Sequence, residues 1–563
     1  MANILTRPGR LPAISLLIVY VSVRAEVPTL DYLFPAGGQR GTTNSLTIGG
    51  KFDPWPLKVW IDSPGLRFEP QTNKGSLKVI IEPEAKVGAH LVRIFNDDGA
   101  SAPRWFVVGM ERKISEIETN DSWTQAQRIE ALPITINGRL EKSGDVDSFA
   151  VQLAAGKWMI ATMDAYAIGS PIDPNLSLLD DHGMRVAFNS DSVQSLDPLL
   201  AYKVEKSGTY ILQVNAFAHP PASEVRFAGS AASVYRLSVG QGPVARSFFP
   251  VSIRQGSQAT INIEGWNVDP GSSEATWQVD SEQSAGVPFL PVPLSGGKLH
   301  LAINDLPHEA EREPNNSNAD AQPLHWPGTI DGRIDPAGDE DRFRLSVKKN
   351  EKIEFRLRSA SLGLPLDAFL RIDDSNGKQV ARDDDSGEAS DPLLNWTAPS
   401  NGTYIVVIAD LFRRGGRDYG YALEMRAPVA DFKVTVDSSA FRIEPGKTNE
   451  IKLAINRTAA HTNKLTATIG GLPEGVTAET AKIGAKDKEA KIRLIAAPEA
   501  RPFSAPIQIL ITDLANRNLR RKAVFDLGAK EGRFGEMLIN LTDQLWLTVT
   551  TNSPPPAEKP KPK

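Results

Sequence analysis

The chain has 563 residues, of which 41% are hydrophobic and 23% are charged, and its formal net charge at pH 7 is −5. A chain of this length should form several domains, and its mild acidity argues against a nucleic-acid partner. The sequence contains no cysteine, which excludes thiol catalysis, zinc–thiolate sites and disulfide bonds. The 44 glycines and 41 prolines are spread along the whole length, which favours an all-β chain with many turns.

Residues 1–25 have the pattern of a secretory signal peptide. Arg7 and Arg10 form a basic start, residues 11–23 form an apolar stretch, and a small-residue cleavage pattern ends at Ala25. The apolar stretch is short for a membrane span, and no other segment is long enough to be one; an uncleaved N-terminal anchor is the alternative. Loss of this segment would remove three arginines and no acid, so the charge would move from −5 to about −8. We expect a bacterial protein that is exported to the periplasm, the cell surface or the medium.

Strand-like runs dominate the chain from its first domain onward. Residues 45–48, 77–81, 91–95 and 105–108 are apolar or alternating runs, and turns that contain Gly, Pro or polar residues separate them. This pattern is typical of β-sandwiches. A short helix is predicted only over 121–129, after an Asn/Asp cap.

A long internal repeat begins at Glu116. The segment Glu116-Ile-Glu-Thr-Asn-Asp121 recurs as Glu311-Arg-Glu-Pro-Asn-Asn316. From the Gly-Asp-x-Asp-x-Phe motif at Gly144 and Gly338 onward, the two copies keep a fixed offset of 194 residues through Asp-Pro-Leu-Leu and Gly-Thr-Tyr-Ile motifs. A constant offset over this length indicates a duplicated module.

A fainter repeat lies upstream of the first. Phe34-Pro35 and the strand that follows it parallel Phe249-Pro250 and its strand, at an offset of 215 residues. The duplicated unit is therefore predicted to be a pair of domains, a small sandwich followed by a larger one. A fifth β-rich region begins near 429, and the Pro/Lys-rich end is predicted to be disordered.

The expected fold class is all-β, a tandem array of about five β-sandwich domains, some immunoglobulin-like and some jelly-roll-like. The predicted segments are a signal peptide at 1–25, sandwiches at 26–110, 111–241, 242–308, 309–427 and 428–552, and a disordered tail at 553–563.

The motifs carry a resemblance to known families. Residues 116–240 and 311–427 resemble the bacterial pre-peptidase C-terminal (PPC) domain, a jelly-roll-like sandwich similar to the collagen-binding domain of clostridial collagenases. The sequences that carry it are Glu313-Pro-Asn-Asn316, Gly338-Asp-Glu-Asp-Arg-Phe343, Asp374-Ser-Asn-Gly377 and Gly402-Thr-Tyr-Ile405. The first copy departs from the family pattern at Thr119 and His182. Residues 30–109 resemble an immunoglobulin-like TIG domain, 243–306 a shortened one, and the segment from 429 an immunoglobulin-like module of secreted bacterial enzymes.

The repeated acidic motifs could hold a cation. Residues two apart in an extended segment point the same way, so each Glu-x-Glu-x-Asn run places three oxygen-bearing side chains on one face, and each Asp-x-Asp pair does the same. Calcium takes six to eight oxygen ligands, and a cation is a physical reason to bring such like charges together. The candidate ligands are Glu116, Glu118, Asn120, Asp145 and Asp147 in the first module, and Glu311, Glu313, Asn315, Asp339 and Asp341 in the second. The resemblance implies calcium at these positions, whereas the alternative is a solvated acidic linker.

Other candidate sites are weaker. The cluster Asp383-Asp-Asp385 fits an EF-hand poorly and is predicted to belong to hairpin turns. The sequence has no His-Glu-x-x-His, Gly-x-Ser-x-Gly or Gly-x-Gly-x-x-Gly motif, so we expect no enzymatic activity. Trp55 is the best candidate for an exposed binding aromatic. Trp60, Trp105, Trp158 and Trp546 lie at strand positions and are predicted to be core anchors.

Three functions compete. The leading hypothesis is a secreted, non-catalytic binding or adhesion protein of the bacterial surface or envelope, with calcium as a structural ion and an unidentified protein or polysaccharide ligand. Two like binding faces on one chain would then gain avidity. The rival is an accessory component of an exported peptidase or other hydrolase, which the resemblance implies. A hydrolase with an unrecognised site is the third.

Overall fold

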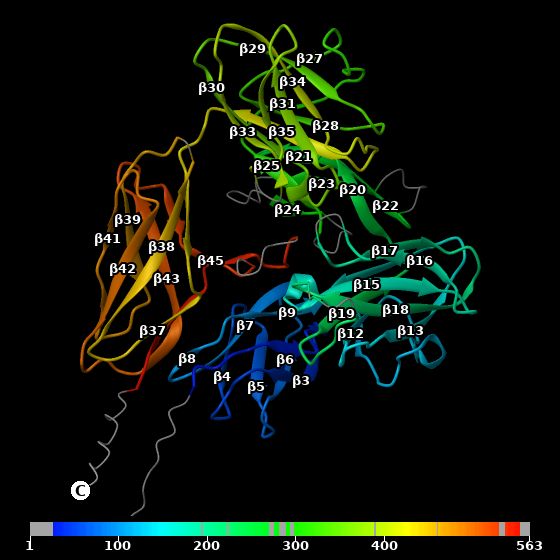
Figure 1. Cartoon of the computed structure of the whole chain (residues 1–563), viewed down its shortest axis with the longest axis vertical. Helices are drawn as coiled ribbons and strands as arrows, with labels where there is room; N and C mark the ends of the chain where they lie inside the picture. The colour runs from blue at the N-terminus through cyan, green and yellow to red at the C-terminus, as the bar shows by residue number, and fades with distance from the viewer. Residues whose placement is uncertain are drawn as a thin grey trace, which may run out of the picture.

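The computed structural model describes residues 26–551 except 193–194, 222, 224–225, 269–274, 281–288, 293–297, 388–389, 459 and 529–534. The expected signal peptide and the expected tail lie outside these residues. The described chain forms ten sheets, which pair into five two-layered units, called domains 1 to 5 below (Figure 1). The predicted all-β fold class is confirmed.

Domain 1 packs the sheet β1-β3-β6-β5 against the sheet β2-β9-β7-β4, with β8 at the side of β7. Its strands are β1 (Tyr32–Phe34), β2 (Gly37–Gln39), β3 (Thr43–Gly49), β4 (Lys58–Ile61), β5 (Leu66–Pro70), β6 (Ser76–Ile81), β7 (Gly88–Asn96), β8 (Gly99–Ala100) and β9 (Arg104–Gly109). Along β6 every second side chain is buried, Leu77, Val79 and Ile81, which is the alternation of a strand with one face on a core.

Domain 2 has two five-stranded sheets, ordered β10-β12-β19-β14-β17 and β11-β13-β18-β15-β16. Its strands are β10 (Lys113–Ser115), β11 (Gln127–Arg128), β12 (Ile134–Arg139), β13 (Asp147–Leu153), β14 (Trp158–Asp164), β15 (Ile172–Leu179), β16 (Arg185–Asn189), β17 (Leu199–Lys203), β18 (Gly208–Ala218) and β19 (Val234–Gly240).

Domain 4 repeats the strand order of domain 2 element by element, as β26-β28-β35-β30-β33 and β27-β29-β34-β31-β32. Its strands are β26 (His308–Ala310), β27 (Gln322–Pro323), β28 (Gly328–Arg333), β29 (Asp341–Val347), β30 (Lys352–Arg358), β31 (Ala368–Asp373), β32 (Gln379–Asp383), β33 (Leu393–Thr397), β34 (Gly402–Asp410) and β35 (Gly420–Arg426). The identical order supports the duplication inferred from the sequence.

Domain 3 is a small sandwich of the sheets β20-β22-β23 and β21-β25-β24. Its strands are β20 (Val244–Phe249), β21 (Ser252–Arg254), β22 (Gln258–Trp266), β23 (Ala275–Asp280), β24 (Phe289–Pro291) and β25 (His300–Asn304). The parallel pair β21–β25 corresponds to the parallel pair β2–β9 in domain 1. Leu362, Leu364 and Ala422 of domain 4 belong to the same buried cluster as the core of domain 3, so the smaller sandwich completes its core on its neighbour.

Domain 5 pairs the sheet β40-β42-β38-β36-β45-β46 with the sheet β37-β47-β43-β39-β41, and β44 lies on β43. Its strands are β36 (Phe432–Val436), β37 (Ala440–Ile443), β38 (Thr448–Arg457), β39 (Leu465–Gly470), β40 (Val476–Ala478), β41 (Ala481–Ile483), β42 (Glu489–Ala496), β43 (Phe503–Asp513), β44 (Arg520–Lys522), β45 (Val524–Asp526), β46 (Leu541–Thr542) and β47 (Leu545–Val549).

The described residues contain no α-helix, only the 3₁₀ turns η1 (Trp123–Gln125), η2 (Tyr166–Ile168) and η5 (Ala360–Leu362). The short helix predicted over 121–129 is therefore wrong: the chain makes one tight turn and then enters β11. No helical segment in the described part of the chain has the length and apolar character needed to cross a membrane.

The joint inside each two-domain unit is built in the same way twice. The guanidinium of Arg139, at the end of β12, lies 4.6 Å from the ring centre of Phe34 in domain 1. Arg333, at the end of β28, lies 4.4 Å from the ring centre of Phe249 in domain 3. Such cation–π contacts stabilise by about 0.5–2 kcal/mol, and their recurrence supports a duplicated pair of domains rather than a duplicated single domain.

Candidate metal centre

Two clusters of carboxylates occupy equivalent places at the start of domains 2 and 4. One carboxylate oxygen from each of Glu116, Glu118 and Asp147 lies within 4.8 Å of the others. The same separation holds for Glu311, Glu313 and Asp341. In both cases the two Glu come from the linker that follows the first strand of the domain, and the Asp opens β13 or β29.

Backbone hydrogen bonds place the linker across the end of the sandwich. The N–H of Glu116 donates to the carbonyl oxygen of Asn137 in β12 (3.0 Å), and the N–H of Ser148 in β13 donates to the carbonyl oxygen of Asn120 (3.0 Å). Because β12 and β13 belong to different sheets, the linker joins the two layers. In domain 4 the N–H of Glu311 donates to the backbone carbonyl oxygen of Asp331 (2.9 Å), and the N–H of Arg342 donates to the backbone carbonyl oxygen of Asn315 (3.2 Å).

A buried tyrosine binds two members of each cluster. The hydroxyl of Tyr235 lies 2.5 Å from Asp147 Oδ2 and 3.4 Å from Glu116 Oε2. The hydroxyl of Tyr421 lies 2.5 Å from Asp341 Oδ2 and 3.2 Å from Glu311 Oε2. Sequence reasoning missed both tyrosines because Tyr235 and Tyr421 are 186 residues apart, whereas the repeated motifs are 194 residues apart. The spacing differs because the loop before β35 is shorter than the loop before β19.

Each cluster brings a buried aspartate and a partly buried glutamate together beside an exposed second glutamate. Burial raises the pKa of Glu116, and the charge of Asp147 raises it further; burial likewise raises the pKa of Asp147. In domain 4, burial raises the pKa of Asp341, with a further contribution from Glu311, and burial raises the pKa of Glu311 as well. Carboxyls in this setting hold protons more tightly than usual unless another positive charge is supplied.

The donor set fits a hard cation. Asn120 and Asn315, two residues beyond Glu118 and Glu313, are fully buried, and neither their side-chain oxygen nor their side-chain nitrogen has a hydrogen-bond partner. One oxygen each of Asp147 and Asp341 is also buried without a donor. Buried polar atoms are normally paired, and oxygen-rich sets of carboxylates and amides are what calcium binds.

The two predicted sites differ at their second aspartate. In domain 2 a carboxylate oxygen of Asp145 lies within 4.8 Å of oxygens of Glu118 and Asp121, so Glu118 belongs to two groups. In domain 4 the two oxygens of Asp339 accept N–H groups of Asp335 (3.1 Å) and Glu340 (2.9 Å). Asp145 also accepts a backbone N–H, that of Glu141, but Asp339, unlike Asp145, belongs to no three-carboxylate group among the described residues. Asn316 stands where domain 2 has Asp121.

Other acidic clusters have ordinary structural roles. Asp383 accepts hydrogen bonds from Ser386 and from the N–H of Leu393 (2.7 Å), within loops of the β31–β32–β33 meander. Asp180, Asp181 and His182 come within metal-binding separation of one another but lie in an exposed turn before β16. Exposed acidic turns of this kind are common without an ion.

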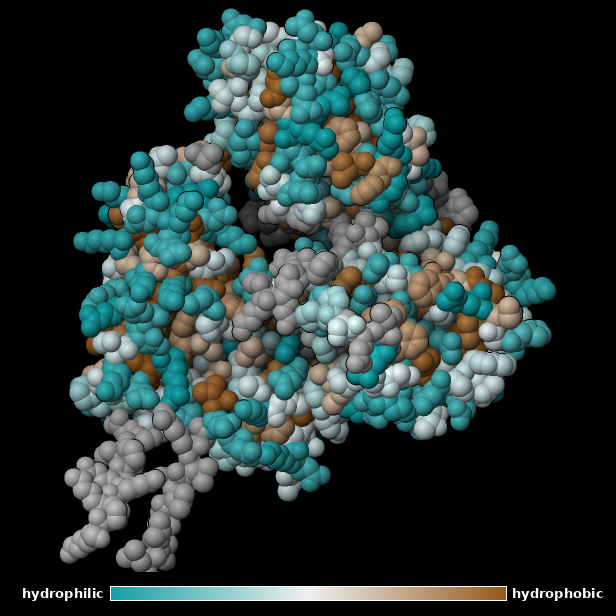
Figure 2. Space-filling view, viewed as in Figure 1, coloured by the Kyte–Doolittle hydropathy of each residue, from teal (hydrophilic) through white to brown (hydrophobic). Residues whose placement is uncertain are grey.

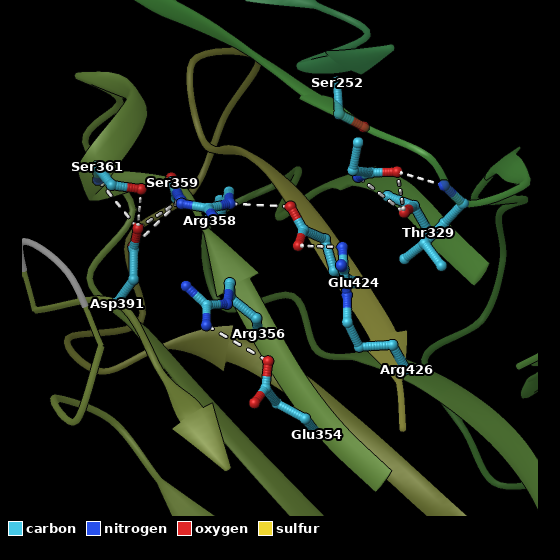
Figure 3. Close-up of polar contacts among 12 residues, drawn as sticks. Ser252, Thr329, Glu354, Arg356, Arg358, Ser359, Ser361, Asp391, Glu424 and Arg426 are labelled. Carbon is cyan, nitrogen blue, oxygen red and sulfur yellow. Dashed lines mark hydrogen bonds and ion pairs between the residues drawn. The ribbon is translucent and has the colours of Figure 1, made fainter. Parts of the chain in front are cut away.

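The repeated Asp-Pro-Leu-Leu motif caps a turn. The carboxylate of Asp391 accepts the N–H groups of Ser359, Ala360 and Ser361 and the Ser361 hydroxyl, as Figure 3 shows for the two serines. Asp197 accepts the N–H groups of residues 165–167 in the same way, at 2.8–3.0 Å. The motif is thus explained by the η2 and η5 turns and is no part of the metal centre.

Figure 3 also shows Arg358 and Arg426 on Glu424, on the face of domain 4 that meets domain 3.

The tryptophan predictions need correction. Trp60, Trp105, Trp158 and Trp546 point away from the core of their own sandwich, since their strand neighbours form that core. They lie instead where domains meet: Trp158, for example, packs at 6.5 Å against Trp266 of domain 3. Trp55, predicted to be exposed, is half-buried against Phe52 and donates to the carbonyl oxygen of Gln71 (2.8 Å).

Comparison with known proteins supports the family resemblance. The family model of the bacterial pre-peptidase C-terminal domain matches residues 339–410, within domain 4. No curated protein matches the chain. Among solved structures, the pre-peptidase C-terminal domain of collagenase from Bacillus anthracis is 15% identical over 22% of this chain and 99% of its own, with a TM-score of 0.16.

Two larger structures align over most of the chain. Tripeptidyl peptidase 2 is 10% identical over 88% of this chain and 39% of its own, with a TM-score of 0.16. The structure of the M60 catalytic domain with two CBM51 domains from Clostridium perfringens is 8% identical over 72% of this chain and 54% of its own, with a TM-score of 0.13. At these identities and scores, none of the three structures bears on what this chain binds or does.

The fold and the family match together define the class: a multidomain β-sandwich protein assembled from a duplicated two-domain unit. More particularly, domain 4 carries the region that matches the PPC-domain family model, and domain 2 repeats the topology of domain 4.

Proposed function

We propose that this protein is a secreted, non-catalytic binding or adhesion protein of the bacterial surface or envelope. Calcium would be a structural ion at the two acidic clusters. Its ligand would be a protein or polysaccharide, and the mature chain would carry no membrane span. The signal-like segment at 1–25 and the match to the PPC-domain family model support export.

The observation that carries the calcium proposal is the recurrence of one cluster at two joints. Both clusters combine two linker glutamates, one buried aspartate, a tyrosine hydroxyl and a buried, unpaired asparagine. The second glutamate of each cluster is exposed, but a solvated linker would have no reason to bury the aspartate, the tyrosine and the asparagine twice. A divalent cation would balance their charge and hold the linker against both sheets.

The clusters are connected to the joints with the preceding domains. The backbone N–H of Arg333 donates to Glu311 Oε1 (2.5 Å), and its guanidinium lies on Phe249 of domain 3. The backbone N–H of Arg139 likewise bonds to Glu116, and its guanidinium lies on Phe34 of domain 1. An ion that fixes the Glu carboxylate therefore fixes the residue that contacts the neighbouring domain, so calcium would stiffen the joint.

Calorimetric titration of the whole mature chain with calcium tests this proposal. Wild type should bind calcium in the micromolar to millimolar range. The double variants Glu116→Gln/Asp147→Asn and Glu311→Gln/Asp341→Asn should each lose the binding of one domain. Asp180→Asn, in the exposed turn, is the matched control and should change nothing. Absence of heat up to millimolar calcium, with no rise in melting temperature, would refute the calcium proposal.

A second function is favoured by the description of the matched family. The pre-peptidase description of the matched family suggests an accessory subunit that binds substrate or assists secretion for a separate hydrolase. Pull-down with the whole chain, in calcium and then in chelator, separates the two. Recovery of a hydrolase would favour the accessory role, and retention on purified envelope polymers would favour the binding protein.

A further inference from the structure

The first and last domains of the chain lie against each other. Figure 1 shows domain 5 beside domain 1, with β37 close to β8. The contact joins segments more than 300 residues apart, and it includes two side chains that would be exposed if the domains separated.

Arg93 of β7 is the first of these side chains. Its neighbours Val92 and Ile94 belong to the core of domain 1, so Arg93 points out of that sandwich. It is nevertheless 0% exposed. Its guanidinium donates to the carbonyl oxygens of Gln544 (2.9 Å) and Ser439 (3.3 Å) in domain 5, and to the Ser439 hydroxyl (3.2 Å).

Trp546 of β47 is the second. Leu545 and Leu547 beside it belong to the core of domain 5, so Trp546 points outward, yet it is only 1% exposed. Its ring lies 5.7 Å from that of Trp60 and 4.8 Å from that of Phe95, both in domain 1. An ion pair between Arg442 and Asp98 (3.6 Å) lies at the same contact.

A segment between β45 and β46 extends the contact to domain 2. Met537 and Ile539 pack with Trp105 of domain 1 and Ile168 of domain 2 in one apolar cluster. The indole N–H of Trp105 donates to the carbonyl oxygen of Ile539 (3.3 Å). The N–H of Leu538 donates to the carbonyl oxygen of Ala167 (2.9 Å), so domain 5 holds both members of the first two-domain unit.

We propose that domain 5 is a clasp: it docks on domains 1 and 2 and closes the five-domain chain into a compact ring instead of an extended string. The partner of this surface is the same chain. A buried guanidinium with carbonyl and hydroxyl acceptors, at a contact that also packs Trp546 on Trp60, is the composition of an energetically dominant contact. Arg93 also donates to the carbonyl oxygen of Ser101 in domain 1 (2.8 Å), whereas its bonds to Ser439 and Gln544 form only when the domains meet. This inference is independent of calcium.

The clasp can be tested by cutting the folded chain. A site-specific protease sequence inserted between Ala427 and Pro428, in the linker from β35 to β36, allows cleavage after folding. The two pieces of nicked wild type should elute together from a sizing column at about micromolar concentration. Arg93→Ala and Trp60→Ala should weaken the association of the pieces by about 30-fold or more.

Arg67→Ala is the matched control, because this arginine belongs to domain 1 but its side chain is 63% exposed. It should elute like wild type, and thermal unfolding before cleavage checks that every variant is folded. Separation of the nicked wild-type pieces, or equal retention in both interface variants, would overturn the proposal. A concentration-dependent dimer of the uncut chain held by the same residues would also overturn it, because the contact would then join two copies.

Discussion

Domains 2 and 4 share their fold and their buried acidic cluster but differ on the outer face of the second sheet. In domain 4 that face carries Arg342, Arg344, Arg371 and Arg382, which flank buried Val407. The aligned positions in domain 2 are Ser148, Ala150, Ser177, Phe188 and Gln213. The two copies have thus kept the buried acidic cluster that joins the linker to both sheets, whereas the outer face of the second sheet differs between them.

This difference bears on one expectation from the sequence, the avidity of two like binding faces. Avidity from two like modules requires two like faces, and these faces are chemically different. Their charges are also largely balanced in domain 4, since Arg342, Arg371 and Arg382 pair with Glu340, Asp373 and Asp384. Figure 2 shows a surface that is mainly hydrophilic, with scattered hydrophobic residues. The two modules are therefore better compared by their buried clusters, capped turns and domain joints. Four predictions test these features.

The largest effect should follow loss of the aspartate that caps the η2 or η5 turn. Asp391→Ala removes the acceptor of three N–H groups, one buried and two partly buried, which should cost about 3 kcal/mol. Asp197→Ala should do the same in domain 2. Differential scanning calorimetry should show that each variant lowers the transition of its own domain. Asp391→Asn keeps an acceptor and should lose less; a loss below about 1 kcal/mol in both alanine variants would contradict the capping role.

The second prediction concerns pH. Carboxyls with raised pKa values bind more protons in the folded state than in the unfolded state, so stability without calcium should fall as pH rises from about 5 to about 8. Saturating calcium should remove most of this dependence. Glu311→Gln/Asp341→Asn should flatten the profile of domain 4 alone. A melting temperature in chelator that rises over this pH range would show that the clusters do not control stability.

The third prediction uses the residue that differs between the clusters. Asp121→Asn gives domain 2 the residue of domain 4 and should abolish any ion held by Glu118, Asp121 and Asp145. Asn316→Asp is the reciprocal change. Equilibrium dialysis should show one calcium fewer in Asp121→Asn, with the remaining affinity changed less than about tenfold. An unchanged stoichiometry would mean that this second group binds no ion.

The smallest effect is expected at the joints. Arg139→Ala and Arg333→Ala remove a cation–π contact and should each cost about 0.5–1 kcal/mol. Arg139 pairs with Glu141 of its own domain (2.7 Å), whereas Arg333 pairs with Glu264 of domain 3 (3.6 Å), so the effect on the joint should be the greater for Arg333. Limited proteolysis should show faster cleavage at the corresponding linker. Equal cleavage of variants and wild type would argue that these contacts do not hold the joints.

Much of the fold could be predicted from the hydrophobic pattern of the sequence, and much of the candidate metal site could be predicted from the repeated motifs. Alternation along segments such as 77–81 predicted strands, and the constant offset predicted the duplicated unit. The carboxylates Glu116, Glu118 and Asp147 were predicted because extended geometry brings alternate residues together. Tyr235 and Tyr421 could not be predicted in this way, because they reach the cluster through the packing of distant strands.

The contact between domains 1 and 5 had no signature in the sequence. Trp60 and Trp546 occupy strand positions, and the sequence does not tell whether a tryptophan in a strand faces the core of its own domain or a neighbouring domain. Only the burial of the strand neighbours Leu545 and Leu547 in the core of domain 5 shows that Trp546 points outward. Residues that anchor domain contacts therefore looked like core residues until the two faces of each strand were known.

The most direct test of the calcium claim is the anomalous signal from crystals of the whole chain grown with calcium. The account predicts one peak among Glu116, Glu118 and Asp147, a neighbouring peak among Glu118, Asp121 and Asp145, and one peak among Glu311, Glu313 and Asp341. Peaks confined to the exposed turn at Asp180, or no peak at either cluster in calcium-saturated crystals, would contradict it.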